Sequence, residues 1–162
     1  MRTNAESVTR YRTGNGGSLH VSSEVCIDRP AHAVWGLLAD PQRWPEWSPI
    51  CSECSLTASG TFATGALLRM RLRFRLAAID VQVKVISLRP CEEICWEARI
   101  FGIRVVHRYS VRSEDHGCVL TNEELFCGLS QPFRFIVHSW FRLTGLSLAS
   151  LQGIKRVAEG AH

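Results

Sequence analysis

The sequence predicts an α+β domain in which a curved antiparallel sheet wraps its apolar face around a long C-terminal helix. Three observations predict this fold. One strand-like segment comes before two short helical segments, several segments with two-residue apolar alternation follow, and the chain closes with apolar residues at helical spacing. The 162 residues, 46% of them hydrophobic and 21% charged, have the length and composition of a single domain with a packed core.

The N-terminal part of the chain is expected to form one strand and two short helices. Residues 1–18 are polar and contain several glycines, so we expect a flexible arm there. Apolar residues at every second position predict a strand over residues 19–27. Asp28 then caps a predicted helix, and the proline-rich residues 44–49 predict a short helical turn that packs its tryptophans against the domain.

Alternation in the middle of the chain predicts a run of antiparallel strands. They are expected over residues 68–76, 79–85, 94–100, 103–111 and 118–126. In the first of these, an inner set of Leu68, Met70, Leu72, Phe74 and Leu76 alternates with Arg69, Arg71, Arg73 and Arg75. We expect the arginines to form a solvated outer face, and a surface for nucleic acid or phospholipid headgroups is the alternative. In the last segment the inner face is open between two sets, Leu120, Asn122, Glu124 and Phe126 or Val119, Thr121, Glu123 and Leu125.

The C-terminal part of the chain carries the pattern of an amphipathic helix. Apolar residues recur at spacings of three and four over residues 133–157. Gly145 and Gly153 interrupt this pattern. Because each glycine lowers helix propensity by up to about 1 kcal/mol relative to alanine, we expect a bend or a close approach of the sheet at these positions.

Charge and hydropathy exclude several classes of protein. The net charge is +4, but the basic residues are scattered among acidic ones, so we expect no nucleic-acid partner. No stretch approaches the roughly 18 apolar residues of a transmembrane segment, and the first residues lack the apolar core of a signal peptide. We therefore expect a soluble, cytoplasmic protein, and the oligomeric state stays open between monomer and homodimer.

The cysteines and short motifs point to no metal and no cofactor. The chain has 7 cysteines, of which only Cys51 and Cys54 form a C-x-x-C pair. Without a second pair, free thiols that pack as small hydrophobic groups are the expected state, and whether these two ever pair stays open. The chain also lacks the G-x-S-x-G, P-loop and G-x-G-x-x-G motifs of hydrolases, nucleotide-dependent enzymes and dinucleotide-binding enzymes.

The order of these elements and several local motifs resemble the START-like helix-grip superfamily, also called SRPBCC. Within it, the chain is similar to the polyketide cyclase/dehydrase and lipid-transport-like branch. The resemblance covers nearly all of an expected domain over residues 19–158. The motifs that carry it are Ile27-Asp28-Arg29-Pro30 with Val34-Trp35, residues 37–41, residues 43–49, residues 102–109, and residues 124–128.

The resemblance implies a large internal cavity between the sheet and the long helix that holds a small hydrophobic molecule. The inward apolar sets support a pocket independently, because apolar walls with a few polar groups are typical of ligand sites. A filled core is the alternative, since aromatic residues also dominate cores. The expected ligand-binding residues are Trp47, Met70, Leu72, Phe74, Val83, Trp96, Ala98, Phe126, Trp140, Phe141 and Thr144.

Three polar residues are the candidates for catalysis. His107 and Tyr109 share one face of a predicted strand, where an acid/base group and a hydroxyl could meet a ligand. Glu124 matches a recurrent acidic position of the superfamily. A histidine that is only structurally satisfied, and a glutamate that serves as its partner or that of the long helix, are the alternatives.

Two functions follow from this site. In the first, the protein binds or carries a lipid, aromatic or polyketide-like molecule without a chemical step. In the second, it is a cyclase or dehydratase in which His107, Tyr109 and Glu124 move a proton. Related aromatase/cyclases often place an inward arginine beside these groups, whereas the arginines of residues 68–76 are expected to point outward, which weakens the second reading. An interaction protein on the same fold is a third class.

Overall fold

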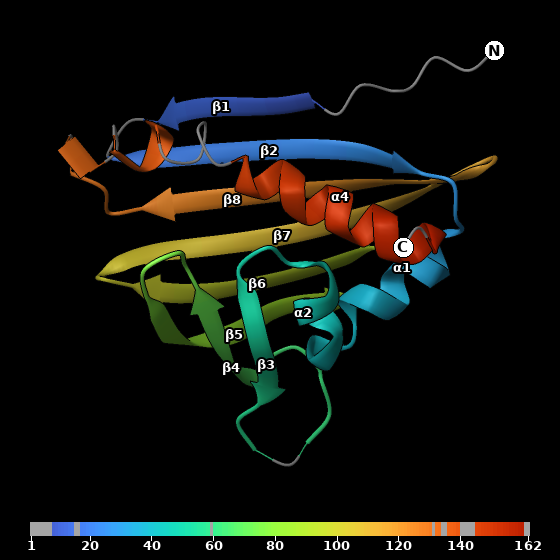
Figure 1. Ribbon diagram of the computed structural model, residues 1–162, viewed down its shortest axis with the longest axis horizontal. Coiled ribbons are helices and arrows are strands. Elements are labelled where there is room, and N and C mark those ends of the chain that lie inside the picture. The colour runs from blue at the N-terminus through green and yellow to red at the C-terminus, as the bar shows by residue number, and fades with distance from the viewer. Residues whose placement is uncertain are drawn as a thin grey trace.

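A computed structural model describes residues 8–14, 17–58, 60–130, 132–133, 136–139 and 145–160. One eight-stranded antiparallel sheet, in the order β1-β2-β8-β7-β6-β5-β4-β3, curves around helix α4 (Figure 1). The strands are β1 Val8–Gly14, β2 Ser18–Ile27, β3 Cys51–Leu56, β4 Leu67–Arg73, β5 Ala78–Arg89, β6 Glu93–Ile100, β7 Ile103–Glu114 and β8 Gly117–Cys127. The helices are α1 Ala31–Leu38, η1 Pro41–Arg43, α2 Trp44–Trp47 and α4 Leu146–Glu159.

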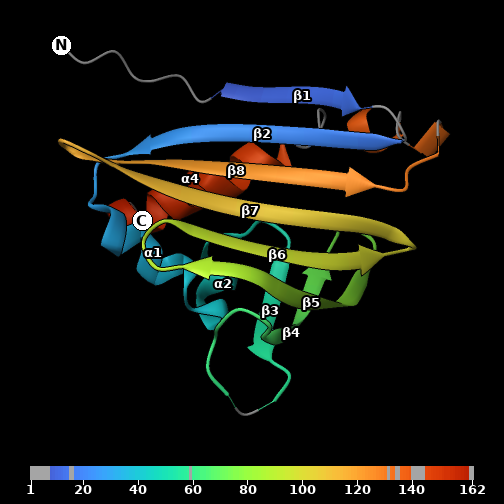
Figure 2. The same cartoon turned by 180° about the vertical axis from the view of Figure 1, so that it is seen from behind.

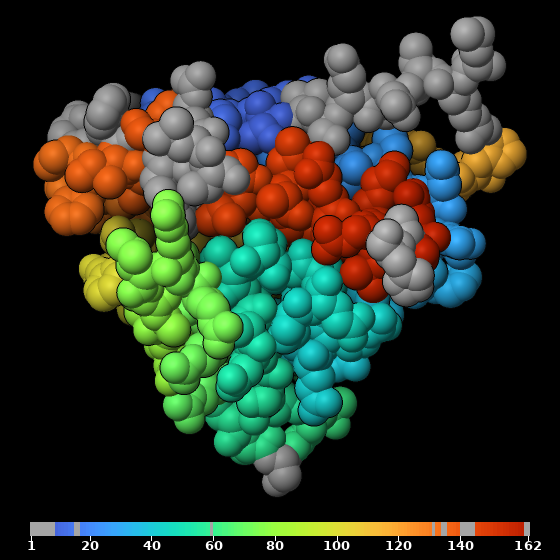
Figure 3. Space-filling model, in the orientation of Figure 1, coloured from blue at the N-terminus to red at the C-terminus, as the bar shows by residue number. Residues whose placement is uncertain are grey.

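The arrangement of the layers confirms the predicted α+β helix-grip fold. Helices α1, α2 and α4 lie on the concave side of the sheet, and Figure 2 shows the strands in front of them when the molecule is seen from behind. The space-filling view in Figure 3 shows α4 in red beside the blue and teal residues of α1 and α2. The core therefore lies between the inner face of the sheet and these helices.

Strand β1 differs from the flexible arm that the sequence predicts. It pairs with β2 along its whole length, from Val8 opposite Glu24 to Gly14 opposite Ser18. Tyr11 packs against a small apolar cluster that includes Leu19 and Val21. The expectation was wrong for residues 8–14 because polar residues suffice for an edge strand, whose outward face needs no apolar partner.

The two short helices form where the sequence predicts them, but the predicted cap is wrong. Helix α1 begins after Pro30 without a side-chain cap. The backbone N–H of Asp28 instead donates to the Glu159 carboxylate of α4 at 2.9 Å. A side-chain cap is present at η1, where Asp40 accepts a hydrogen bond from the backbone N–H of Gln42 at 3.0 Å. The start of α1 is thus fixed by a contact with α4.

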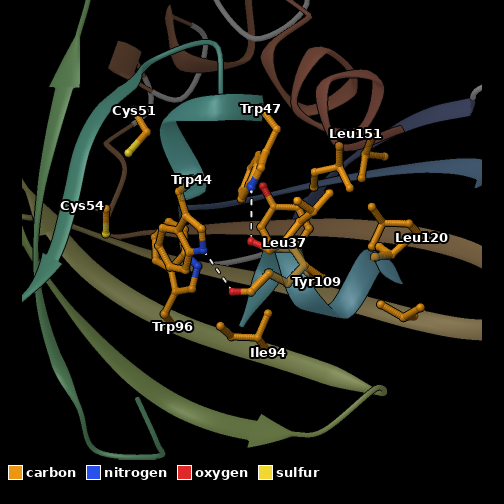
Figure 4. Close-up of a cluster of buried hydrophobic side chains, with 14 of the residues drawn as sticks. Leu37, Trp44, Trp47, Cys51, Cys54, Ile94, Trp96, Tyr109, Leu120 and Leu151 are labelled. Atoms are coloured by element: carbon orange, nitrogen blue, oxygen red, sulfur yellow. Dashed lines mark hydrogen bonds between the residues drawn. The ribbon is translucent and has the colours of Figure 1, made fainter. Parts of the chain in front are cut away.

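Both tryptophans of α2 are buried, as expected for a helical turn that packs against the domain. The indole N–H of Trp44 donates to the Leu38 carbonyl at 3.0 Å, and that of Trp47 donates to the Leu37 carbonyl at 3.4 Å (Figure 4). Both acceptors belong to the last turn of α1. These bonds join the two helices and satisfy carbonyls that the end of a helix leaves free.

The predicted strand over residues 68–76 ends earlier than its sequence pattern. Leu68, Met70 and Leu72 are buried on the inner face of β4, as expected. The strand stops at Arg73, and Phe74 donates its backbone N–H to the Ala77 carbonyl at 2.7 Å across the turn to β5. Leu76 lies in this turn and is exposed, so its assignment to the inner face was wrong. The alternation of residue types continues past the last ladder bond and therefore does not mark the end of the strand.

The inner face of β8 is the one that carries Leu120, Asn122, Glu124 and Phe126. This assignment was open from the sequence, because the two alternating sets contain similar numbers of polar residues. The register decides it, since Tyr109 lies opposite Asn122 and His107 lies opposite Glu124 on β7. An asparagine and a glutamate thus enter the interior of the domain.

The predicted helix over residues 133–157 is broken. Residues 136–139 are helical, but Gly145 adopts a left-handed backbone with a φ of 58°, and α4 begins only at Leu146. Glycine is the residue that takes this conformation without steric cost. Gly153, the second glycine, lies against the backbone carbonyl of Trp47, so the close approach is to α2 rather than to the sheet.

Candidate functional site

A cavity of about 290 Å³ lies between the concave face of the sheet, α2 and α4. Its wall is mostly apolar, and polar groups enter it at six positions. The apolar lining residues are Trp44, Trp47, Ile50, Met70, Leu72, Phe74, Trp96, Ala98, Ile100, Phe101, Ile103, Val105, Phe126, Val137 and Leu146. The polar or ionisable ones are Ser48, Cys51, His107, Tyr109, Glu124 and Ser150.

Most of the residues expected to contact a ligand line this cavity. They are Trp47, Met70, Leu72, Phe74, Trp96, Ala98 and Phe126. Val83 does not belong to the lining: it is fully buried in the core, between Leu68 and Ala98 on the neighbouring strands. Trp140, Phe141 and Thr144 lie outside the described residues.

The sheet brings two of the three catalytic candidates into direct contact. His107 on β7 lies opposite Glu124 on β8, and the distance from His107 Nε2 to Glu124 Oε2 is 3.2 Å. The side chains are 16% and 4% exposed, respectively. A buried carboxylate needs hydrogen-bond donors, and the imidazole supplies one of them. Glu124 is therefore a partner of the histidine, one of the two structural roles considered from the sequence.

Asn122 supplies a second donor and was not among the expected site residues. Its Nδ2 lies 3.0 Å from Glu124 Oε1 and 3.0 Å from Ser147 Oγ of α4. Asn122 is fully buried, and its side chain links the last strand to the helix. Asn122 and Glu124 share one of the two alternating sets of β8. Assigning that set to the inner face would have identified Asn122 as a site residue.

Stacking fixes the plane of the His107 ring. The imidazole lies parallel to the indole of Trp96, its cross-strand neighbour, with ring centroids 4.2 Å apart and an interplanar angle of 4°. Trp44 stacks on the same indole at 6.0 Å. Among the described residues, His107 Nδ1 has no hydrogen-bond partner. Asn122 Oδ1 also has no partner among these residues. Of the two residues, only His107 lines the cavity, so its Nδ1 is the candidate atom for a ligand.

Tyr109 completes the polar part of the cavity and stays a neutral phenol. Burial raises the pKa of Tyr109 above its ordinary value, the negative charge of Glu124 acts in the same direction, and a hydrogen bond with Ser150 opposes them. The ring of Trp47 meets the phenol edge to face at 5.7 Å. The Tyr109 hydroxyl can therefore donate or accept a hydrogen bond, but it does not carry charge near neutral pH.

A β-bulge between Cys51 and Glu53 brings both cysteines of the C-x-x-C pair to the inner face of β3. In a regular strand, residues three apart point to opposite faces. Both thiols are free and buried (Figure 4), and Cys51 lines the cavity. The hydrogen bond between them lowers the pKa of Cys51 and, together with burial, raises the pKa of Cys54.

The described residues contain no group of three or more His, Cys, Asp or Glu side chains suited to hold a metal ion. None of the helices described is long and apolar enough to cross a membrane. The site presents one imidazole with a carboxylate partner, one neutral phenol, one thiol and two serine side chains in an apolar enclosure. Such a site can bury the apolar surface of a ligand and orient the ligand through one or two polar groups.

Comparison with known families agrees with this architecture. Residues 18–159 match the model of the family described as polyketide cyclase/dehydrase and lipid transport. The chain belongs to this family. Membership in the polyketide cyclase/dehydrase and lipid transport family supports a role in binding a hydrophobic ligand or in cyclase chemistry. A search among curated proteins gives no match.

Several solved structures share the fold. The di-domain ARO/CYC StfQ from the steffimycin biosynthetic pathway aligns with a TM-score of 0.73 and 12% identity over 90% of this chain and 52% of that one, so the chain spans about half its length. The Zhui aromatase/cyclase from Streptomyces sp. R1128 aligns with a TM-score of 0.71 and 18% identity over 88% of this chain and 94% of that one. Major latex-like protein 151 from Panax ginseng aligns with a TM-score of 0.69 and 11% identity over 88% of this chain and 99% of that one.

Proposed function

We propose that this member of the polyketide cyclase/dehydrase and lipid transport family binds a small hydrophobic molecule in the cavity and orients it through His107. The observation that carries the proposal is the contrast between an apolar cavity wall and one imidazole nitrogen without a partner. Fifteen apolar residues surround a single buried imidazole whose Nδ1 has no hydrogen-bond partner among the described residues. A ligand with an aromatic or aliphatic body and one hydroxyl group matches both features, because the hydroxyl can donate to the Nδ1 lone pair.

The size of the cavity narrows the ligand class. Ligand pockets have volumes of about 300–1,000 Å³, and the cavity, at about 290 Å³, stands at the lower end of this range. A compact aromatic or polyketide-like molecule fits this space better than a phospholipid with two acyl chains. The indoles of Trp44 and Trp96 both line the cavity and offer such a molecule apolar aromatic surface.

Native mass spectrometry of the purified protein, repeated after denaturation, tests for a copurifying ligand of this class. Calorimetry with a panel of naphthols and fatty acids then measures affinity. Ala98→Phe fills the cavity and is expected to lower the affinity at least tenfold. Ala63→Phe adds the same ring in an exposed loop and is the matched control. Equal affinity of all three proteins would contradict the proposal.

A second candidate function, cyclisation or dehydration of a polyketide-like chain, rests on the pairing of His107 with Glu124. With its Nε2–H directed at the carboxylate, the imidazole keeps the Nδ1 lone pair for a proton next to a carbonyl group. Tyr109 is a neutral donor close to it. For a cyclase, His107→Ala abolishes turnover and leaves ligand affinity within about tenfold, whereas equal loss of both indicates a binding contact only.

A further inference from the structure

Exposed apolar side chains gather at one end of the molecule. Leu76, Phe101, Ile136 and Phe133 are 94%, 88%, 59% and 56% exposed, more than any other large apolar side chain among the described residues. We call these four residues the apolar tips. They come from the β4–β5 turn, the β6–β7 turn and the segment after β8. In Figure 3 these segments form the left edge of the molecule, in green, yellow and orange.

The sheet register places the three segments at the same end. Arg73 pairs with Ala78 around the β4–β5 turn, and Ile100 pairs with Ile103 around the β6–β7 turn. Arg104, one residue further along β7, pairs with Cys127 at the end of β8. The apolar tips therefore extend beyond the same end of the strands, although up to 60 positions separate them in the sequence.

Neither burial in the core nor the conformation of the turn explains why a phenylalanine occupies position 101. Both residues of the β6–β7 turn have positive φ, 51° for Phe101 and 82° for Gly102. Two-residue turns of this kind favour asparagine, aspartate or glycine, and a bulky residue in a left-handed conformation is disfavoured. The ring packs into no core, since it is almost fully exposed. A residue that costs stability in the turn and gains none by burial points to a role at the surface.

The cavity reaches the surface at this end. Phe101 lines the cavity and is also the second most exposed of the apolar tips. Phe74, two residues before Leu76, also lines the cavity. So does Val137, which directly follows Ile136. One apolar tip thus lies at the mouth of the cavity, and residues close in sequence to two others belong to the cavity wall.

Unpaired positive charge borders the apolar tips. Arg73, Arg75 and Arg99 are exposed, and none of them has an ion-pair partner among the described residues. We call them the rim arginines. Of the four arginines in the β4 stripe, Arg69 and Arg71 both bind Asp80, at 2.9 Å and 3.6 Å. Two arginines of the stripe therefore share one carboxylate, whereas Arg73 and Arg75 at the end of the strand have none among the described residues.

We propose that this end of the molecule docks on a lipid bilayer that contains anionic phospholipids. The apolar tips enter the boundary between headgroups and acyl chains, and the rim arginines bind lipid phosphates. A bilayer accepts separate protruding side chains without a matching surface, whereas a protein partner needs shape complementarity. Docking would place the cavity mouth against the acyl chains, so that a hydrophobic ligand can enter without crossing water.

Vesicle flotation tests the proposal without any cavity ligand and therefore does not depend on the proposed function. We expect the protein to float with vesicles of phosphatidylcholine and phosphatidylglycerol, and binding to fall at least tenfold with phosphatidylcholine alone or at high salt. Leu76→Ser with Phe101→Ser should lower binding at least tenfold. Leu67→Ser, a partly exposed leucine at the opposite end of β4, is the matched control and should bind as the unaltered protein does.

A second pair of variants separates charge from apolar contact. Arg73→Gln with Arg75→Gln should remove the preference for anionic vesicles, while Arg112→Gln with Arg156→Gln, which lowers the net charge equally at other exposed positions, should keep it. The proposal is overturned if the unaltered protein does not float, or if both arginine pairs reduce binding equally. The alternative occupant is an acidic protein. The proposal is also overturned if the unaltered protein binds such a partner and the serine variants do not, while none of them binds vesicles. Ligand affinity of Leu76→Ser, measured in parallel, reports on the cavity separately.

Discussion

His107 is held by neighbours on the two strands that flank β7. Trp96 of β6 fixes the plane of the ring, Glu124 of β8 accepts from Nε2, and Asn122 holds the carboxylate in place. The contacts of Trp96 and Glu124 with His107 follow from the register of adjacent strands, because cross-strand neighbours lie within reach of one another. The position of His107 in the cavity is thus a consequence of sheet pairing.

Removing Asn122 should destabilise the protein because a buried carboxylate and a buried serine each lose a partner. For Asn122→Ala we expect a loss of about 1–3 kcal/mol in the free energy of unfolding, measured by urea denaturation. Thr121→Ala changes the neighbouring residue, whose hydroxyl makes an exposed bond with Glu24, and should cost at most about 0.5 kcal/mol. Equal losses in the two variants would show that the buried network contributes nothing.

Cys51 should be the more reactive thiol of its pair. Because the hydrogen bond with Cys54 lowers the pKa of Cys51, its thiolate forms at lower pH, and alkylation by iodoacetamide should begin at lower pH than for Cys54. Cys54→Ala removes this bond and should move the alkylation of Cys51 to higher pH. Peptide mass spectrometry measures both sites. An unchanged profile for Cys51 in the variant would contradict the assigned cause.

The helices are placed by contacts that their own sequences do not reveal. Helix α4 begins after the left-handed Gly145, and its buried face includes Ser147 and Ser150 as well as Leu151 and Ile154. The serines hold Asn122 and Tyr109, respectively. An apolar periodicity predicts that a helix exists and roughly where it ends, but it does not identify polar residues that face a polar cluster.

Two glycines in helix interiors should respond oppositely to substitution by alanine. The Cβ of Gly153→Ala would collide with the Trp47 carbonyl of α2, and we expect a loss of about 1–3 kcal/mol in the free energy of unfolding. Gly36→Ala in α1 meets no atom within 4 Å and should gain about 0.5–1 kcal/mol through helix propensity. Thermal or urea unfolding measures both. A gain for Gly153→Ala would mean that α2 and α4 separate easily.

The molecule as a whole buries several weak acids in their neutral form. Burial raises the pKa of Tyr109 and Cys95 and raises that of Cys118 to about 11. In the unfolded chain cysteine ionises near pH 8.5 and tyrosine near pH 10, by approximate reference values. Above these values the unfolded state binds fewer protons than the folded state, so the free energy of unfolding falls as the pH rises.

The expected result is a urea midpoint that is constant to about pH 8 and declines progressively toward about pH 11. The stabilisation is complete below the ordinary pKa of each group and is lost as the pH passes through the raised one. Cys118→Ala should make the decline shallower, although it also lowers stability at neutral pH by removing a buried thiol. A midpoint that does not depend on pH over this range would contradict the burial of these groups in neutral form.

Local sequence patterns were sufficient to predict the fold class and the inner faces of most strands. Alternation over two residues is a local property, and it selected Leu68, Met70 and Leu72 on β4 and Trp96 and Ala98 on β6 as residues of the inner face. The proline-rich turn with its buried tryptophans was equally local. The expected ligand contacts that line the cavity therefore followed from periodicity together with the family resemblance.

Strand pairing and helix packing were needed to show which face of β8 points inward, where the long helix is broken, and that residues 8–14 add an edge strand. The tertiary structure also brought Cys51 and Cys54 to one face through a bulge, and Leu76 and Phe101 to one end of the sheet. These features depend on pairing partners that are distant in sequence. Local patterns specify how a residue is oriented within its own element, but register and turns specify which elements it meets.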